Sequence, residues 1–300
     1  MKTQFAVNYS VDALALLREG RVDFDLFKCP PWPELLPGVT ARPPYVHFSL
    51  RAGPGKGDGV SGESARTPDW DEIERFLEQT ESRWVNLHLA PSVDDYPEIP
   101  RASVEPAHVE RVAEGLVRDV AGVVARFGTE NVVVENVFSY GGHHLTAGFL
   151  PETVTRVVEE TGCGLILDIA HALIASEELQ IETHAYLEAL PTHRLKELHV
   201  SGVRRFEGPV LERAREIAEA TTEVERLAGK RMDHLPMTGE DWALTAWVLE
   251  RVRAGAWANP GLVTLEMGGI GPFFSILDTK ASLAEEITRL GALLGKDREK

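Results

Sequence analysis

The sequence has few cysteines and no long apolar segment. Its 300 residues include only Cys29 and Cys163, which are far apart and form no Cys-x-x-Cys pair. This argues against a disulfide framework and favours a reducing compartment. No apolar run approaches the roughly 18 residues that a membrane helix needs. The first residues, MKTQFAVNYS, lack the charged and long apolar regions of a signal peptide. We therefore expect a cytoplasmic protein that does not act at a membrane.

Basic charge is also scarce. The chain carries 47 acidic and 31 basic residues, which gives a formal net charge of −16. Such a chain repels nucleic acid unless its basic groups gather on one face, so we expect no nucleic-acid partner. No glycine-rich Gly-x-Gly-x-x-Gly motif follows the first predicted strand. We therefore expect no nucleotide cofactor.

Strand-like and helical segments alternate along the whole chain. This alternation predicts parallel strands joined by right-handed crossovers, and eight units favour a closed (β/α)8 TIM barrel over an open sheet. We expect a single domain over residues 1–300, with a glycine-rich loop inserted at about 51–66 and an irregular proline-rich segment at 29–44. The predicted strands are 5–10, 45–50, 83–90, 131–137, 164–169, 196–201, 231–237 and 262–267, and the predicted helices are 11–19, 70–79, 106–127, 151–161, 181–190, 209–227, 240–254 and 280–294.

Acids and histidines stand at or near the carboxyl end of seven of these eight strands. Asp168 ends the apolar run Leu165-Ile166-Leu167, for example, and His171 follows three residues later. Acids and histidines are rarely fully buried, and burying them costs free energy unless they are paired or bound to something. Because the carboxyl ends of barrel strands open on one face, these side chains predict one site there. The candidate ligands are His47, His88, Glu135, Asp168, His171, His199, Asp233, His234 and Glu266.

These nine side chains predict a metal site. Imidazole and carboxylate together suit zinc, manganese or iron. A catalytic zinc takes three protein ligands and an octahedral ion takes at most six, so nine donors exceed the needs of one ion. The surplus predicts either two or three metal ions, or one ion with additional acid–base and substrate-positioning groups.

The strand-end residues resemble those of the xylose isomerase-like barrel superfamily, which includes sugar isomerases, epimerases and apurinic endonucleases with a three-metal site. In such epimerases, Glu, Asp, His and Glu from the fourth, fifth, sixth and eighth strands hold one divalent metal. The resemblance implies that Glu135 and Glu266 are also an acid–base pair, that His171 contributes to catalysis, and that Arg205 and Asn136 bind substrate. The residues that match the metal quartet are Glu135, Asp168, His199 and Glu266.

Three longer motifs resemble the multinuclear non-haem iron oxidative enzymes, a related family of the same barrels. They are ENVFSY at 135–140, ELHVSG at 197–202 and HLPMTGEDW at 234–242. The resemblance implies two or three irons, oxidative modification of a peptide, often at cysteine, and a partner protein that presents the substrate. The sequence departs from that family at His171, where the family usually has Asn. It also departs at the seventh strand, where the family's Asp-x-His falls on Arg231 and Asp233 and His234 comes one place late.

Four functions follow from these patterns. The preferred one is iron-dependent oxidation of a peptide or small molecule, with manganese, zinc and cobalt as alternative metals. The second is a divalent-metal sugar isomerase or epimerase. The third, a three-zinc phosphodiesterase acting at abasic sites, is disfavoured by the net charge of −16. The fourth is a non-catalytic metal-dependent binding protein, which requires a closed coordination sphere. The sequence leaves the substrate, the number of metals and the oligomeric state open.

Overall fold

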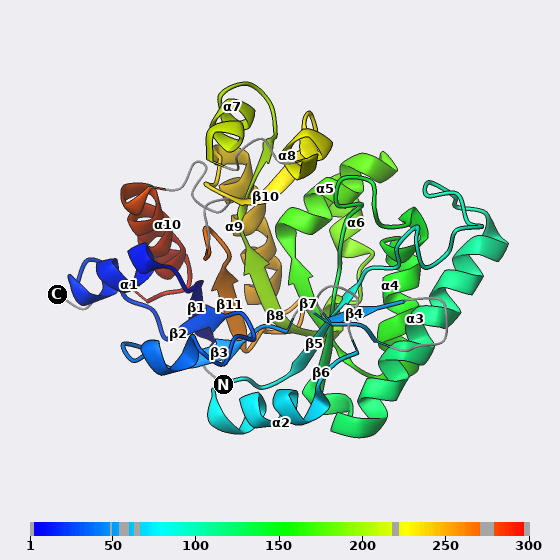
Figure 1. Ribbon diagram of the computed structural model, residues 1–300, viewed down its shortest axis with the longest axis horizontal. Helices are drawn as coiled ribbons and strands as arrows, with labels where there is room; N and C mark the ends of the chain where they lie inside the picture. Colours follow the sequence, from blue (N-terminus) through cyan, green and yellow to red (C-terminus); the bar gives the residue numbers. More distant parts are fainter. Residues whose placement is uncertain are drawn as a thin grey trace. The chain divides into compact units, whose positions relative to one another are not determined.

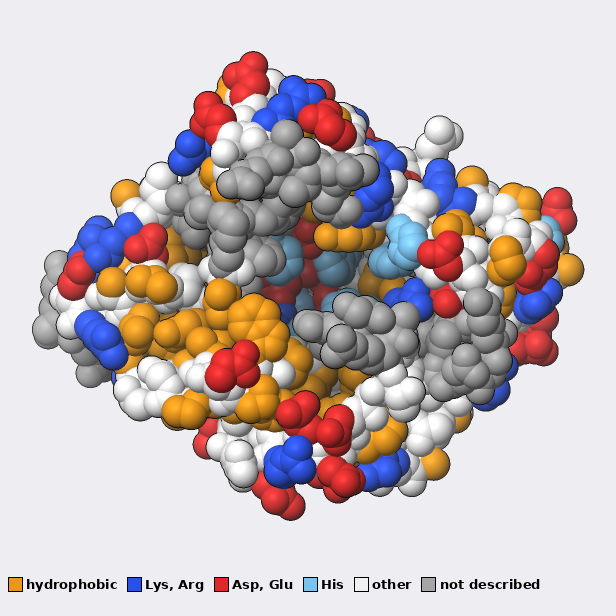
Figure 2. Space-filling model, in the orientation of Figure 1, with side chains coloured by type: hydrophobic (Ala, Val, Ile, Leu, Met, Phe, Trp, Pro, Cys, Tyr) orange, Lys and Arg blue, Asp and Glu red, His pale blue; other side chains and the backbone are white. Residues whose placement is uncertain are grey.

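The computed structural model describes residues 3–48, 50–53, 60–62, 67–217, 222–270 and 279–296. These residues belong to two compact units, a central unit, Val46–Glu197, and a terminal unit formed by Met1–Tyr45 and Leu198–Lys300. Most of the glycine-rich loop predicted at 51–66 lies outside the described residues. None of the described helices combines the length and the apolar character needed to cross a membrane. Acidic and basic side chains are interspersed over the visible face of the molecule (Figure 2).

The central unit contains a parallel sheet with the strand order β4-β5-β6-β7 (Figure 1). Every residue of β6 and β7 is buried, as expected for apolar strands covered on both faces. The register places His88 of β5 beside Glu135 of β6. The elements of this unit are β4 (Leu50–Ala52), α2 (Trp70–Gln79), β5 (Val85–Leu89), α3 (Pro106–Phe127), β6 (Val132–Glu135), α4 (Pro151–Thr161), β7 (Gly164–Asp168), α5 (Ile169–Leu179) and α6 (Thr183–Glu188).

Three helices of the central unit, α2, α3 and α4, begin and end where their sequence predicts, whereas α5 was not predicted and α6 is shorter than the helix predicted over 181–190. Pro106 and Pro151 occupy the first turns of α3 and α4, where proline loses no hydrogen bond. Gly128 and Gly162 follow the two helices with positive φ angles of 88° and 71°, which glycine adopts without strain. The two helices pack against each other (Figure 1). The predicted bounds of α2, α3 and α4 are all confirmed.

The terminal unit also contains parallel strands, in the order β3-β2-β1-β11-β8. Helix α1 packs against α10 (Figure 1). Strand β2 corrects the prediction of eight strands, because LFKC at 26–29 was not recognised as a strand. Strands β3 and β8 contain the boundaries between the units. The elements are β1 (Gln4–Asn8), α1 (Val11–Arg18), β2 (Leu26–Cys29), β3 (Pro44–Val46), β8 (Leu195–Val200), β9 (Gly202–Arg205), α7 (Gly208–Ile217), α8 (Thr222–Leu227), β10 (Arg231–Leu235), α9 (Gly239–Arg253), β11 (Leu262–Leu265) and α10 (Lys280–Leu293).

The predicted seventh strand, 231–237, differs from the parallel strands. It forms β10, which pairs antiparallel with β9 in a separate two-stranded sheet. The single long helix predicted over 209–227 is two helices, α7 and α8, with residues 218–221 outside the described part. The apolar sides of α7 and α8 pack on β9 and β10 and form a small separate hydrophobic core. That core consists of Phe206, Ala214, Val224, Leu227, Met232 and Leu235.

Candidate metal centre

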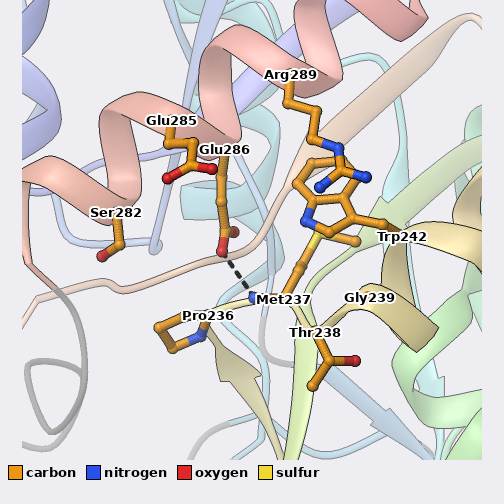
Figure 3. Close-up of a pocket in the computed structure, with 9 residues that line it drawn as sticks. All are labelled: Pro236, Met237, Thr238, Gly239, Trp242, Ser282, Glu285, Glu286 and Arg289. Carbon is orange, nitrogen blue, oxygen red and sulfur yellow. Dashed lines mark hydrogen bonds between the residues drawn. The ribbon is translucent and has the colours of Figure 1, made fainter.

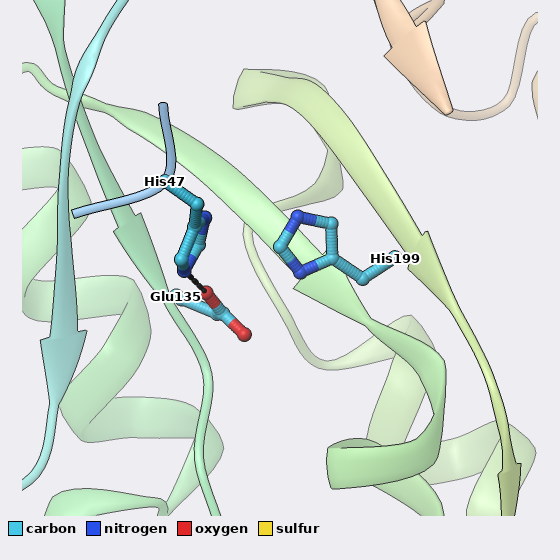
Figure 4. A group of neighbouring side chains, drawn as sticks. All are labelled: His47, Glu135 and His199. Atoms are coloured by element: carbon cyan, nitrogen blue, oxygen red, sulfur yellow. Dashed lines mark ion pairs between the residues drawn. The ribbon is translucent and has the colours of Figure 1, made fainter. Parts of the chain in front are cut away.

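Glu135 is the centre of a buried cluster in the central unit. Its Oε2 lies 3.3 Å from Nε2 of His47 and 3.4 Å from Nε2 of His88. Its Oε1 lies 3.4 Å from Nδ1 of His171. Figure 4 shows His47 directed at the carboxylate of Glu135. Glu135 and Asp168 also offer ligand atoms within 4.8 Å of each other. The structure therefore brings together all five ligands predicted in this unit.

Strand geometry explains how these side chains meet. The parallel register of β5 and β6 sets His88 beside Glu135. His47 lies between β3 and β4, so the strand predicted at 45–50 is interrupted at the candidate ligand. The side chain of buried Asn86 spans this interruption, because Oδ1 accepts from Phe48 N and Nδ2 donates to Phe48 O. Nδ2 of Asn86 also lies 2.9 Å from Nε2 of His47. Asn86 thus fixes His47, a role that the sequence did not indicate.

Backbone carbonyls set the orientation of two histidine rings. Nδ1 of His88 is 3.2 Å from Leu50 O, and Nδ1 of His171 is 2.8 Å from Asn136 O. Because a carbonyl only accepts, each Nδ1 is the protonated nitrogen of its ring. In the neutral ring Nε2 is then the nitrogen that a metal ion can bind, and in His171 it lies 3.7 Å from Oδ2 of Asp168. The tautomers therefore suit metal ligation.

Asp168 is fully buried at the junction of β7 and α5. Its Oδ1 accepts from the backbone N–H of His171 and caps α5. The side chain of Asn136 holds the backbone of Asp168 at both ends, since Oδ1 accepts from Asp168 N and Nδ2 donates to Asp168 O. Asn136, predicted to bind substrate, thus has both polar ends on this backbone. The cap leaves Oδ2 as the carboxylate oxygen beside His171.

Glu266 is the centre of a second cluster, in the terminal unit. Its Oε2 lies 3.3 Å from Nδ1 of His199 and 4.0 Å from Nε2 of His234. Its Oε1 forms an ion pair with the ammonium of Lys28. Asp233 joins the cluster through His234, whose Nε2 lies 3.6 Å from Oδ2 of Asp233. The four predicted ligands of this unit therefore form one group, and Lys28 is a member that sequence reasoning missed.

A β-bulge brings Asp233 and His234 to the same cluster. Neighbouring residues of a regular strand point to opposite faces. In β10 the register shifts between Met232 and Leu235, and His234 has a positive φ of 59°, which is uncommon outside glycine. Bulges of this kind redirect side chains. The bulge explains how consecutive residues both contribute, although His234 stands one place from the expected position.

Arg205, which was predicted to bind substrate, is the last residue of β9. Its side chain is exposed on β9, and Nη1 donates to the carbonyl of Gly229. Its predicted role in substrate binding stays a prediction.

The HLPMTGEDW motif lines a small pocket of about 200 Å³ in the terminal unit. Thr238 and Asp241 form a reciprocal capping box at the start of α9. Glu286 of α10 accepts from Met237 N, and the guanidinium of Arg289 lies 4.3 Å from the ring centroid of Trp242 (Figure 3). These contacts join the motif to α9 and α10. The pocket contains none of the predicted metal ligands.

The chemistry of the two clusters fits divalent metal ions. The Glu135 cluster and the Glu266 cluster offer only nitrogen and oxygen donors, which iron, manganese and zinc accept. Cys29 and Cys163 are free, in agreement with the prediction that the chain has no disulfide framework, and both are buried. Burial raises the pKa of Cys29 to about 12 and that of Cys163 to about 11, so neither is a thiolate near neutral pH. Carboxylate and imidazole therefore carry the site chemistry.

His144 provides a pH-dependent contribution to stability. Burial lowers its pKa to about 4, although Nδ1 hydrogen-bonds to Phe138 O, which acts in the opposite direction. The folded protein therefore favours neutral His144. We expect this contribution, about 2 kcal/mol after allowance for partial exposure, to be present above the ordinary pKa of about 6.5 and to be lost as the pH falls toward 4. Urea unfolding at pH 7 and pH 4.5 should show a smaller loss of stability for His144→Gln than for the wild type; equal losses would contradict this assignment.

Comparisons with known proteins connect this geometry to a family and a fold. Residues 61–239 match the model of the RiPP precursor modification enzyme family MbnB/TglH/ChrH. A UPF0276 protein of Pseudomonas aeruginosa is 34% identical over 135 residues, which are 43% of this chain and 44% of that protein. A UPF0276 protein of Caulobacter vibrioides is 28% identical over 156 residues, which are 49% of this chain and 52% of that protein. The chain thus spans about half the length of these relatives.

A solved structure supports the predicted fold. The crystal structure of a xylose isomerase domain-containing protein from Salmonella typhimurium LT2 matches with a TM-score of 0.51 and 15% identity, covering 98% of each chain. Together with the alternating parallel strands and helices, this match confirms the predicted α/β TIM-barrel fold. Because the family model covers more than half of the sequence, the chain belongs to the RiPP precursor modification enzyme family MbnB/TglH/ChrH.

Proposed function

We propose that this protein is an iron-dependent oxidative enzyme that modifies a peptide and binds at least two metal ions per chain. Family membership supports an enzyme that acts on RiPP precursors, which are ribosomally made peptides. The Glu135 cluster and the Glu266 cluster each supply enough donors for an ion of their own. We also propose that a partner protein presents the peptide.

The position of His47 and His88 is the observation that carries this proposal. Nε2 of each ring lies within 3.4 Å of Oε2 of Glu135. A one-metal isomerase of this fold needs only one set of metal ligands, so two further histidines at Glu135 would have no role. Their presence supports a multinuclear centre.

The residues of the chain would contribute ligation, orientation and exclusion of water. Bound iron supplies one-electron chemistry with dioxygen as the electron acceptor. Asn86 fixes His47, and the carbonyls of Leu50 and Asn136 fix the rings of His88 and His171. Such partners keep ligands oriented and tune their basicity. Glu135 and Asp168 are buried, so this carboxylate pair is shielded from bulk water.

A divalent-metal sugar isomerase or epimerase is the second candidate. One observation favours it: Glu135, Asp168, His199 and Glu266, the four residues that match the epimerase ligands, are all at most 2% exposed. In that function Glu135 and Glu266 would move protons between substrate atoms.

Elemental analysis of protein purified without chelator tests both candidates. We expect two or more iron ions per chain, because each cluster supplies enough N and O ligands for one ion. Anaerobic reconstitution with ferrous iron should restore the same stoichiometry after chelation. A single manganese or cobalt ion per chain would contradict the oxidative proposal and support the isomerase, and protein that binds no metal after reconstitution would contradict both.

A further inference from the structure

Lys28 is an unusual neighbour for a candidate metal ligand. Its side chain is buried at 8% exposure, and its ammonium forms an ion pair with Oε1 of Glu266. Lysine is almost never fully buried unless it is paired. The other carboxylate oxygen, Oε2, faces His199 and His234. Lys28 thus pairs with one of the two carboxylate oxygens of Glu266, the residue at the centre of this cluster.

The register of the sheet fixes this arrangement. Ala6 of β1 pairs with Leu26 of β2 and with Thr264 of β11. Lys28 lies two residues after Leu26 in β2, and Glu266 lies two residues after Thr264, just beyond the end of β11, so strand alternation places their side chains on the same face as Leu26 and Thr264. The backbone of Lys28 is held by its pairing with Asn8 and by a hydrogen bond from Tyr9 N to Lys28 O. The pairing of β2 with β1 therefore places the ammonium of Lys28 beside Glu266.

The charge of Lys28 opposes the binding of a cation at this carboxylate. Glu266 and Asp233 contribute two negative charges to the cluster, and the ammonium of Lys28 neutralises that of Glu266. A divalent ion on Glu266 would lie close to the ammonium, and like charges repel strongly where little water screens them. Lys28 also competes for an oxygen that the ion could otherwise use.

We propose that Lys28 is a built-in cation that lowers the metal affinity of the Glu266 cluster and serves as the counter-charge of Glu266 in the metal-free protein. This inference rests on the proposed metal site. It assigns Lys28 a positioning role through Glu266, with no contact to substrate. The inference also predicts that the two clusters differ in metal affinity, because the carboxylate oxygens of Glu135 face histidines and not a lysine.

Calorimetric titration with Mn²⁺ under argon tests this inference in the full chain. We expect Lys28→Met to tighten the Glu266-dependent binding step by tenfold or more, while Lys28→Arg, which keeps the charge, stays near the wild type. Lys28→Gln provides a second neutral variant if Lys28→Met folds poorly. Lys196→Met is the matched control, because Lys196 pairs with Glu130 at the surface. Glu266→Gln should remove the affected step.

The double variant Lys28→Met with Glu266→Gln shows whether Lys28 acts through Glu266. We expect it to bind Mn²⁺ as Glu266→Gln alone does, since the two side chains form one interaction. If the wild type binds metal and Glu266→Gln loses a step, but the neutral Lys28 variants bind with unchanged or weaker affinity, Lys28 is an ordinary structural partner and the inference is wrong. If neither the wild type nor the neutral Lys28 variants show a step that depends on Glu266, the proposed terminal metal site itself is wrong.

Discussion

Replacing Asp168 with alanine is expected to remove most of the metal bound by the central unit and to destabilise the metal-free protein by about 1 kcal/mol. The two effects come from different oxygens. Oδ1 caps α5 through the backbone N–H of His171, and loss of such a cap typically costs about 0.5–2 kcal/mol. Oδ2 lies beside Nε2 of His171 and is the oxygen that we assign to a metal ion.

Asp168→Asn separates the cap from the ligand. Asparagine caps helices about as well as aspartate, so its metal-free stability should stay within about 0.5 kcal/mol of the wild type. Its neutral amide is a poor metal ligand, so the metal should still be lost. Elemental analysis and urea unfolding in chelator measure the two effects. Unchanged metal content in both variants would remove Asp168 from the ligand set.

The regular part of the fold follows from patterns that a single segment contains. The apolar spacing of 106–127, with Pro106 at its start and Gly128 at its end, is enough to define α3. Strand β2 was missed because LFKC is only four residues long and contains a lysine, which in isolation indicates an exposed segment. Its strand character comes from pairing with β1, which no local pattern reveals. The antiparallel pairing of β10 is likewise decided by its partner β9.

In the candidate site, too, some residues could be predicted from their own segment and others depend on contacts with distant segments. Glu135 and Asp168 were predictable, because each ends a buried apolar strand with a carboxylate. Asn86 and Lys28 were not, because their roles depend on a side chain from a distant segment of the chain. Asn86 lies inside an apolar strand and bonds to the segment of His47. The Asp233–His234 bulge also escaped prediction, since strand alternation assigns these neighbours to opposite faces.

Glu135→Gln should weaken metal binding by the central unit by about 100-fold or more and abolish oxidative activity. Even partners outside the ligand sphere typically change metal affinity by about 10–100-fold, and Glu135 is the carboxylate to which His47, His88 and His171 are all directed. The amide keeps the shape of the side chain but not its charge. Calorimetry with Mn²⁺ and peptide turnover with reconstituted iron measure the two losses.

Stability distinguishes a metal ligand from a structural ion pair at Glu135. Burying the carboxylate of Glu135 costs desolvation free energy, so in chelator Glu135→Gln should be as stable as the wild type or more stable. Saturating metal should then stabilise the wild type more than Glu135→Gln, by about 2.7 kcal/mol when the metal is at 100 times the dissociation constant of the central site. Glu130→Gln is the matched control, because Glu130 lies just before β6 and pairs with Lys196 at the surface. A large loss of metal-free stability in Glu135→Gln, with metal binding retained, would show that Glu135 organises the histidines without ligating an ion, and the multinuclear proposal would lose its central ligand.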